Sequence, residues 1–270
     1  MSEPAREIAP AKLNLALHVR GKRSDGRHNI ETIFAFCTDS DRLSAEPGDV
    51  IRLDVTGPFA GELGDSEDNL VVRAARALAE QAGVTEGATI RLDKRLPVAS
   101  GIGGGSADAG ATLRLLTSIW RIDPIHASRV APTLGSDVPA CLLSLSVRGD
   151  GAGEQLTPTD SGDFAGSPVL LVNPRVGVST AEVFARWDGV DRGPLASWRE
   201  GRNDLTEPAT AVAPQIEAVL SWLELQSGAT FVRMSGSGAT CFALFDSELS
   251  RDAAEVAVPR EWWRLATFLR

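Results

Sequence analysis

The sequence predicts an α+β protein built from two domains. Helical and strand-like patterns are mixed along the 270 residues, several strands are joined as hairpins, and no segment repeats another. Residues 157–166 are polar and small and include a proline, which is typical of a junction between domains. We therefore expect an N-terminal domain at residues 1–160 and a C-terminal domain at residues 161–270, each long enough to bury a core.

Alternating apolar residues predict the first strands. Residues 13–19 and 30–36 alternate between apolar and polar side chains on either side of a basic turn, which is typical of a hairpin. A cap at 66–69 begins a helix that Gly83 ends, and the Ala- and Leu-rich run 108–120 predicts a buried helix. The remaining elements expected in this half are strands at 50–55, 88–92 and 142–148 and a short helix at 126–134.

The C-terminal half shows the same mixture of patterns. Residues 207–225 carry apolar side chains at helical spacing and predict a single helix. Ser179 and Thr180 cap a short helix that ends near Trp187. The other elements expected here are strands at 169–172, 231–234, 241–245 and 263–268 and a helix at 248–256.

Composition limits the classes of function. The chain is 43% hydrophobic with a formal net charge of −9, and this acidic balance argues against a general role on nucleic acids or membrane surfaces. No run of about 18 apolar residues predicts a membrane helix, and the first residues lack an apolar signal core. The three cysteines lie far apart, and no metal-ligand spacing links them to the three histidines. We expect a cytoplasmic protein with reduced thiols and no zinc site.

Four glycines lie among residues 101–105, between the strand at 88–92 and the helix at 108–120. Glycines let the backbone approach a ligand closely, and a helix N-terminus offers unpaired N–H groups and a partial positive charge. This arrangement predicts a phosphate site, whereas a flexible turn or a helix cap needs fewer glycines. A P-loop would have Lys after Gly105, and the dinucleotide fingerprint would have glycine in place of Ser106, so the loop belongs to neither class.

Three segments together resemble the motifs of the GHMP small-molecule kinases. They are Ala9-Pro10-Ala11-Lys12-Leu13-Asn14-Leu15, the stretch from Pro97 to Ser106, and Met234-Ser235-Gly236-Ser237-Gly238-Ala239. Further segments at 25–28, 135–139 and 203–205 are similar to one branch of this superfamily, and the whole resemblance spans about residues 8–246. A spaced set of motifs is far more specific than a single glycine loop.

The resemblance implies a fold and a reaction. It implies an N-terminal domain like ribosomal protein S5 that carries ATP, and a ferredoxin-like α/β C-terminal domain. The matching branch transfers the γ-phosphoryl group of ATP, with Mg²⁺, to the 2-hydroxyl of a methylerythritol unit that carries a cytidine diphosphate group, in the non-mevalonate route to isoprenoid precursors. The expected partner is that small molecule, with no nucleic acid, membrane or protein partner implied.

The resemblance also implies catalytic roles for Lys12 and Asp137. Asp137 would lie beside the acceptor hydroxyl and take or orient its proton, and Lys12 would keep Asp137 ionised and place positive charge near the transferred group. These roles suit phosphoryl transfer, which depends on positioning and charge neutralisation. Taken alone, a lysine at a strand end and an aspartate in a turn or cap have ordinary structural explanations. No protein ligand for a metal is predicted firmly, although the Ser106 hydroxyl could contact Mg²⁺.

The remaining site residues fall into three groups. The predicted ATP-binding residues are Asn69, Pro97, Val98, Ala99, Ser100, Gly101, Ile102, Gly103, Gly104, Gly105, Ser106 and Ala107. The predicted acceptor-binding residues are Asn14, Arg27, His28, Thr180 and Phe184, of which His28 would hydrogen-bond the cytosine and Phe184 would stack on it. The third glycine motif contributes Ser235, Gly236, Ser237 and Gly238, as a tight turn near the phosphates or the acceptor.

The chain departs from the family pattern at two of these positions. The residue before the family histidine is usually tyrosine, and here it is Arg27, in a chain that has no tyrosine. A guanidinium plane can also stack on a base. The family loop often ends with two serines, and here Ala107 takes the place of the second.

Two other functions remain open from the sequence. One is another GHMP kinase, acting on an acceptor such as homoserine or mevalonate. The other is a non-catalytic nucleotide-binding protein with the same fold, which would have no need of both Lys12 and Asp137.

Overall fold

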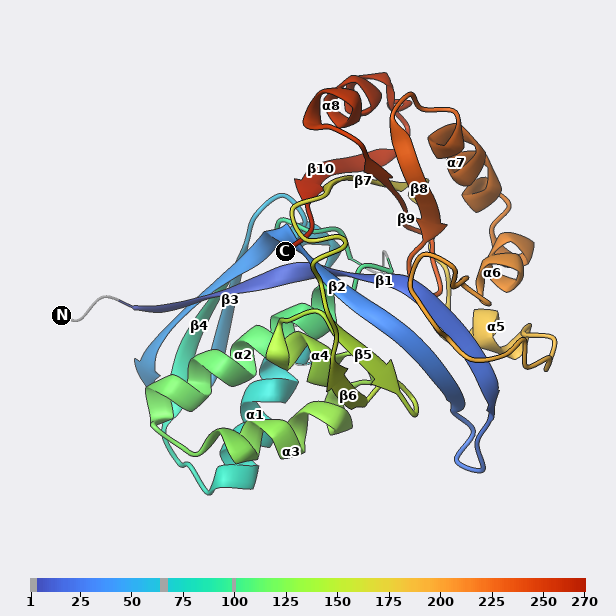
Figure 1. Cartoon of the computed structure of the whole chain (residues 1–270). Helices are drawn as coiled ribbons and strands as arrows, with labels where there is room; N and C mark the ends of the chain where they lie inside the picture. Colours follow the sequence, from blue (N-terminus) through green and yellow to red (C-terminus); the bar gives the residue numbers. More distant parts are fainter. Residues whose placement is uncertain (1–3, 64–67, 99–100) are drawn as a thin grey trace. The chain divides into compact units, whose positions relative to one another are not determined.

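The computed structural model describes residues 4–63, 68–98 and 101–270 (Figure 1). The chain forms two compact units that interleave along the sequence. The first unit contains Met1–Ala11, Ser40–Val98 and Gly103–Leu145, and the second contains Lys12–Asp39, Ala99–Ile102 and Ser146–Arg270. A division of the chain at residue 160 stays a prediction.

Three strands meet in the first unit. β4 (Gly87–Asp93) pairs in parallel with β3 (Arg52–Thr56) and antiparallel with the last residues of β2 (His28–Gly48). Alternate residues of β4 are buried, as the pattern at 88–92 predicts. The end of β4 leads directly toward the glycine loop.

Four helices gather beside these strands. They are α1 (Leu70–Ala82), α2 (Gly104–Trp120), α3 (Pro124–Leu134) and α4 (Val138–Leu143), with α2 in contact with each of the other three (Figure 1). A Cβ at Gly110 would lie 2.6 Å from the carbonyl carbon of Cys141, so only glycine allows α2 and α4 to approach this closely. α2 begins four residues earlier than predicted, inside the glycine run itself.

Two elements differ from the prediction. Residues 142–148 do not form one strand: α4 runs to Leu143, and β5 (Val147–Asp150) begins only after Ser144 has ended the helix with φ 52°. A proline in the first turn of α4 favours the helix, which is a signal that the apolar run hides. Residues 207–225 form two helices, α6 (Thr206–Val212) and α7 (Gln215–Glu224), because Pro214 follows Ala213 and disfavours helical backbone there.

The second unit contains the predicted hairpin. β1 (Ala5–Lys22) pairs with β2, and the two strands are much longer than the alternating segments predict. β5 pairs antiparallel with β2 and with β6 (Gln155–Pro158). Leu17, Val19 and Ile30 from this hairpin join the core of the second unit.

A four-stranded antiparallel sheet forms the rest of the second unit. Its order is β10 (Trp263–Phe268), β7 (Pro168–Asn173), β9 (Cys241–Phe245), β8 (Ala229–Met234). α7 and α8 (Glu248–Ala257) bury their apolar residues with one face of this sheet, and α5 (Thr180–Ala185) follows β7 in the chain. Within the described residues, no helix is both long and apolar enough to cross a membrane.

Candidate active site

The glycine loop opens directly into the first turn of α2. Gly103 precedes the helix with φ 67°, which glycine adopts without strain, and it has no side chain to cap the helix. The N–H of Ala107 donates to the Gly103 carbonyl at 2.8 Å, which closes the first turn. Among the described residues no side chain caps this helix start, and a phosphate fits the N–H groups of such a helix N-terminus. The predicted residues Ala99 and Ser100 lie outside the described residues.

A buried charge cluster lies beside this helix start. Lys94 follows β4, and its Nζ donates to Asp41 Oδ2 at 2.5 Å and to Asp108 Oδ2 at 2.7 Å. The three side chains are between 0% and 4% exposed. A Cβ at Gly104 would lie 3.1 Å from Lys94 Nζ, so the ammonium group packs against the first residue of α2. The sequence analysis missed this cluster, although Lys94 and Asp108 flank the glycine run closely.

The charge cluster holds one more carboxylate than cations. Burial raises the pKa of Asp108 to about 7, and the nearby charge of Asp41 adds to this effect while Lys94 opposes it. Burial alone would lower the pKa of Lys94, but the two carboxylates outweigh it and raise that pKa. Asp108 Oδ1 is buried and has no hydrogen-bond partner among the described residues. Asp108 can thus hold a proton near neutral pH.

Lys12 and Asn14 form a buried pair on β1. Lys12 Nζ donates to Asn14 Oδ1 at 2.8 Å, and both residues are 2% exposed. The Asn14 amide nitrogen donates to Thr32 Oγ1 at 2.8 Å, which fixes the orientation of the amide. The backbone N–H of Lys12 donates to the carbonyl of Ile102 in the glycine loop at 2.8 Å. The structure therefore brings together a predicted catalytic residue, a predicted acceptor contact and a predicted loop residue.

The third glycine motif joins the same group. Ser235 Oγ accepts the N–H of Asn14 at 3.1 Å and donates to the Gly101 carbonyl at 3.2 Å. A Cβ at Gly101 would lie only 2.4 Å from the Gly238 carbonyl oxygen, so the loop and the turn pack without room for a side chain. The hydroxyl groups of Ser237 and Thr180 are hydrogen-bonded at 2.8 Å.

Three rings meet where the acceptor base is predicted. The rings of His28 and Phe184 stack with centroids 4.9 Å apart and 28° between their planes. Trp187 lies edge-on to His28 at 5.6 Å, whereas Arg27 is exposed on the turn between β1 and β2. Burial, assisted by the charge of Lys22, lowers the pKa of His28, so the ring is neutral at pH 7. Trp187 was not among the residues predicted from the sequence; it lies just beyond the end of α5, three residues after Phe184.

Asp137, Asn69 and Ser106 belong to the first unit. Asp137 is half-buried at the start of α4 and accepts a hydrogen bond from Ser136 Oγ at 3.3 Å. Asn69 caps α1, because its Oδ1 accepts the N–H of Val71 at 2.9 Å. Ser106 is half-buried in the first turn of α2. The pairing of Asp137 with Lys12 and the contacts of Asn69 and Ser106 with a nucleotide stay predictions.

A cavity of about 640 Å³ opens in the second unit beside α5 and α6. Trp187 lines it, and none of the residues predicted from the sequence does. Four of its charged residues form two pairs, since Arg192 bonds Asp188 and Arg202 bonds Asp204. In the described parts of the chain, no three His, Cys, Asp or Glu side chains are placed to hold a metal ion.

Comparison with known proteins assigns the family. The model of the GHMP kinases N-terminal domain matches residues 69–144, and that of the GHMP kinases C-terminal domain matches residues 188–264. The chain belongs to the GHMP kinase family. The first match contains the glycine loop and Asp137, and both domains predicted by the resemblance are present.

Curated relatives and solved structures refine this placement. The chain is 54% identical to the 4-diphosphocytidyl-2-C-methyl-D-erythritol kinase of Rhizorhabdus wittichii. The alignment covers 98% of this GHMP kinase and 94% of the relative. It is 45% identical to the enzyme of the same name from Sphingopyxis alaskensis, with 100% of both chains covered. A crystal structure of 4-(cytidine 5′-diphospho)-2C-methyl-D-erythritol kinase matches with a TM-score of 0.81 at 33% identity, covering 98% of each chain.

Proposed function

We propose that this kinase transfers the γ-phosphoryl group of ATP to the 2-hydroxyl of 4-diphosphocytidyl-2-C-methyl-D-erythritol. The observation that carries the proposal is the uncapped, glycine-rich start of α2, which fits a phosphate, in a chain 54% identical to a relative named for this acceptor. The product would be the 2-phosphate and ADP, in the non-mevalonate route to isoprenoid precursors, with the enzyme working in the cytoplasm.

The donor side of the reaction rests on the backbone. N–H groups in the first turn of α2 bind the ATP phosphates, and the helix dipole favours the negative charge there. Gly101 and Gly103, with φ of 79° and 67°, let the chain turn sharply before the helix. The Mg²⁺ that accompanies ATP supplies charge neutralisation at the transferred group. The Ser106 hydroxyl, in the first turn of α2, is the protein group proposed to contact it.

The acceptor side rests on Lys12, Asn14 and Asp137. Asp137 takes or orients the proton of the acceptor hydroxyl, so that the oxygen can attack the γ-phosphorus in line. Lys12 supplies positive charge near the transferred group, and its bond to Asn14 at 2.8 Å holds the ammonium in a fixed position. Asn14 is itself fixed by Thr32 and Ser235.

The cytosine is proposed to bind at His28 and Phe184. The neutral His28 ring can donate from one nitrogen and accept at the other, as the edge of a cytosine requires. Trp187 supplies a further aromatic surface in a chain that lacks the usual tyrosine. In the structure His28 covers the face of Phe184 at 4.9 Å, so the base either replaces this contact or binds at the ring edges.

The other two functions are less well supported. Solved structures of a homoserine kinase and a mevalonate kinase match at only 17% and 18% identity, which shows the shared fold alone. A purely binding role gives no reason for the buried Lys12–Asn14 pair.

The test is an ATP-consumption assay with three acceptors: 4-diphosphocytidyl-2-C-methyl-D-erythritol, homoserine and mevalonate. We expect turnover with the first alone. Asp137→Asn should lower kcat by about 10²- to 10⁴-fold with little change in KM, because the carboxylate acts mainly in the transition state. Turnover with another acceptor alone would refute the proposed substrate, and a near-normal kcat for Asp137→Asn would refute the proposed base.

A further inference from the structure

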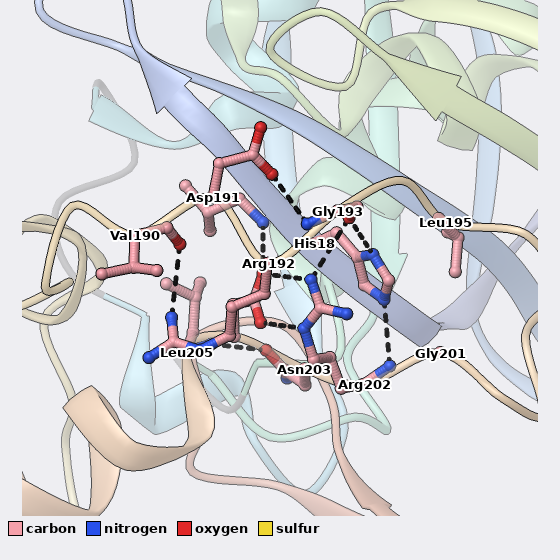
Figure 2. A network of polar contacts seen from close by, with 12 residues as sticks. His18, Val190, Asp191, Arg192, Gly193, Leu195, Gly201, Arg202, Asn203 and Leu205 are labelled. Atoms are coloured by element: carbon pink, nitrogen blue, oxygen red, sulfur yellow. Dashed lines mark hydrogen bonds and ion pairs between the residues drawn. The ribbon is translucent and has the colours of Figure 1, made fainter.

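The segment Arg202–Asp204 is bonded along β1. Leu17 donates its N–H to the Arg202 carbonyl at 2.8 Å, and Asp204 donates its N–H to the Leu17 carbonyl at 2.9 Å. His18 Nε2 accepts the N–H of Arg202 at 3.1 Å (Figure 2). Asp204 Oδ2 accepts the N–H of Val19 at 2.8 Å. These bonds fix the segment to the strand that also carries Lys12 and Asn14.

Asn203 bonds the third glycine motif from this fixed segment. Its Nδ2 donates to the carbonyls of Met234 and Gly236, both at 2.8 Å, and its Oδ1 accepts the N–H of Leu205 at 3.0 Å. The side chain is buried, and both amide hydrogens and the amide oxygen have partners. Asn203 therefore sets the position of the turn between β8 and β9.

The turn that Asn203 holds contacts several groups of the proposed active site. Its Ser235 bonds Asn14 and Gly101, and its Ser237 bonds Thr180. Asn14 in turn bonds Lys12. A shift of this turn would therefore move the ammonium group of Lys12 and a candidate acceptor contact together.

We propose that Asn203 is a positioning residue for phosphoryl transfer, which orients Lys12 and Asn14 through the 234–238 turn. This rests on the proposed function, since the reaction defines what is positioned. Small displacements of reacting groups cost far more in kcat than in binding, by up to about 10²-fold per ångström. Loss of Asn203 should therefore affect kcat more than the KM for ATP, whose phosphates bind the helix start.

The test is Asn203→Asp, which keeps the shape and the acceptor for Leu205. The carboxylate cannot donate to the two carbonyls, and it repels them. We expect kcat at pH 8 to fall by about 10- to 100-fold with the KM for ATP within twofold. A protonated carboxyl group can donate one of the lost bonds, so kcat relative to wild type should rise as the pH falls from 8 to 5.5.

Asn173→Asp is the matched control. Asn173 is also buried and lies in the same unit, but its amide donates to the hydroxyl of Thr240. A hydroxyl group can rotate and act as the donor, so it can still bond a carboxylate at position 173. We expect a much smaller loss of kcat for this variant. Equal losses and equal falls in thermal midpoint for both variants would reduce Asn203 to an ordinary structural residue and overturn the proposal, as would an unchanged kcat for Asn203→Asp.

Hydrogen exchange separates this inference from the proposed function. In Asn203→Asp, the amides of Ser235 and Gly238, which bond Thr240 and Ser235, should exchange at least tenfold faster than in wild type, whatever the acceptor. Unchanged exchange would overturn the positioning role. Faster exchange together with a wild-type enzyme inactive on the cytidine acceptor would support the positioning role and refute the proposed substrate.

Discussion

Two buried polar clusters of this kinase hold their neighbours by different means. In the first unit, Lys94 bonds Asp41 and Asp108 through charged groups that are almost fully buried. In the second unit, the Asn203 amide makes three hydrogen bonds to backbone groups and Asp204 accepts one from a backbone N–H. Arg202, the partner of Asp204, is 35% exposed at its side chain. The first cluster should therefore depend on charge, and the second on hydrogen-bond geometry.

The two clusters also hold different parts of the proposed active site. The Lys94 cluster packs against the start of α2, where the phosphates are proposed to bind. The segment Arg202–Asp204 holds the 234–238 turn, whose serines contact Asn14 and Thr180. One cluster thus supports the groups proposed to bind the phosphoryl donor, and the other supports the groups proposed to bind the acceptor.

The largest effect is expected for Lys94→Met. At pH 8, above the pKa of about 7 at Asp108, methionine keeps a similar length but leaves the two buried carboxyl groups without a cation, which costs about 3–5 kcal/mol in the free energy of unfolding. Chemical denaturation measures this loss. The triple variant Lys94→Met, Asp41→Asn, Asp108→Asn should recover much of it, because no buried charge remains. A loss below about 1 kcal/mol for Lys94→Met would contradict the charge-dependent description of this cluster.

The glycine run and the helix after it were predictable because their signal is local. Gly103, Gly104 and the Ala-rich run are consecutive, so the helix start, and the phosphate site proposed there, follow from them without any distant residue. The end of α4 and the break at Pro214 were missed for the opposite reason. At each place an apolar pattern hides the effect of a proline on the helix.

The polar clusters could not be predicted, because their members are far apart in the sequence. Lys94 bonds Asp41 across 53 positions, and Asn203 bonds Met234 across 31. His28 and Phe184 were assigned to one base only through the family resemblance; in the structure their rings stack, and their contact with a base stays a prediction. The roles predicted for Lys12 and Asp137 await the kinetic test.

The next effect concerns Asp108→Asn and its dependence on pH. Burial raises the pKa of Asp108 to about 7, so the folded state binds a proton that the unfolded state has released above about pH 4. Its favourable contribution is present below pH 4 and is lost as the pH rises through 7. Asparagine keeps an oxygen that accepts from Lys94, and because it does not ionise, its contribution to stability does not fall as the pH rises.

We therefore expect Asp108→Asn to be more stable than wild type at pH 8, by about 1–3 kcal/mol in the free energy of unfolding. At pH 5, where wild type keeps its proton on Asp108, the variant should be less stable than wild type. Urea denaturation at the two pH values measures this difference. Asp93→Asn, whose carboxylate is partly exposed beside Arg95, serves as the control and should show no such reversal. A difference that does not depend on pH would show that Asp108 is ionised throughout this range.

A smaller effect is expected at Asp204, where charge and hydrogen bonding can be separated. Asp204→Asn keeps an acceptor for the N–H of Val19 and loses only the ion pair with the half-exposed Arg202, which should cost below about 1 kcal/mol. Asp204→Ala also leaves the Val19 N–H without its partner and should cost about 1–2 kcal/mol. If asparagine costs as much as alanine, charge dominates here too and the two clusters do not differ.

The smallest effect is expected at His18, which links β1 to the loop before Arg202. Nε2 accepts the N–H of Arg202, so the proton of the neutral ring is on Nδ1, which donates to the Gly193 carbonyl at 3.1 Å (Figure 2). Burial lowers the pKa of His18 below its usual 6.5. The unfolded chain therefore takes up a proton at a higher pH than the folded chain, so this stabilisation is complete above pH 6.5 and is lost as the pH falls below it.

His18→Gln removes this titration and keeps an oxygen that can accept from Arg202. At pH 8 we expect the variant to be less stable than wild type by about 0.5–1 kcal/mol, because the bond to Gly193 is lost. Between pH 6.5 and 5 the difference should shrink, since only wild type loses the His18 contribution. Urea midpoints at half-unit pH steps measure this trend.

His28→Gln is the matched control. Burial also lowers the pKa of His28, but no backbone bond to the 189–204 loop depends on its ring. At pH 5.5 the amides of Arg202 and Asp204 should therefore stay protected from hydrogen exchange in His18→Gln, and should exchange faster in both wild type and His28→Gln. Equal protection in wild type and His18→Gln would show that protonation leaves the segment in place.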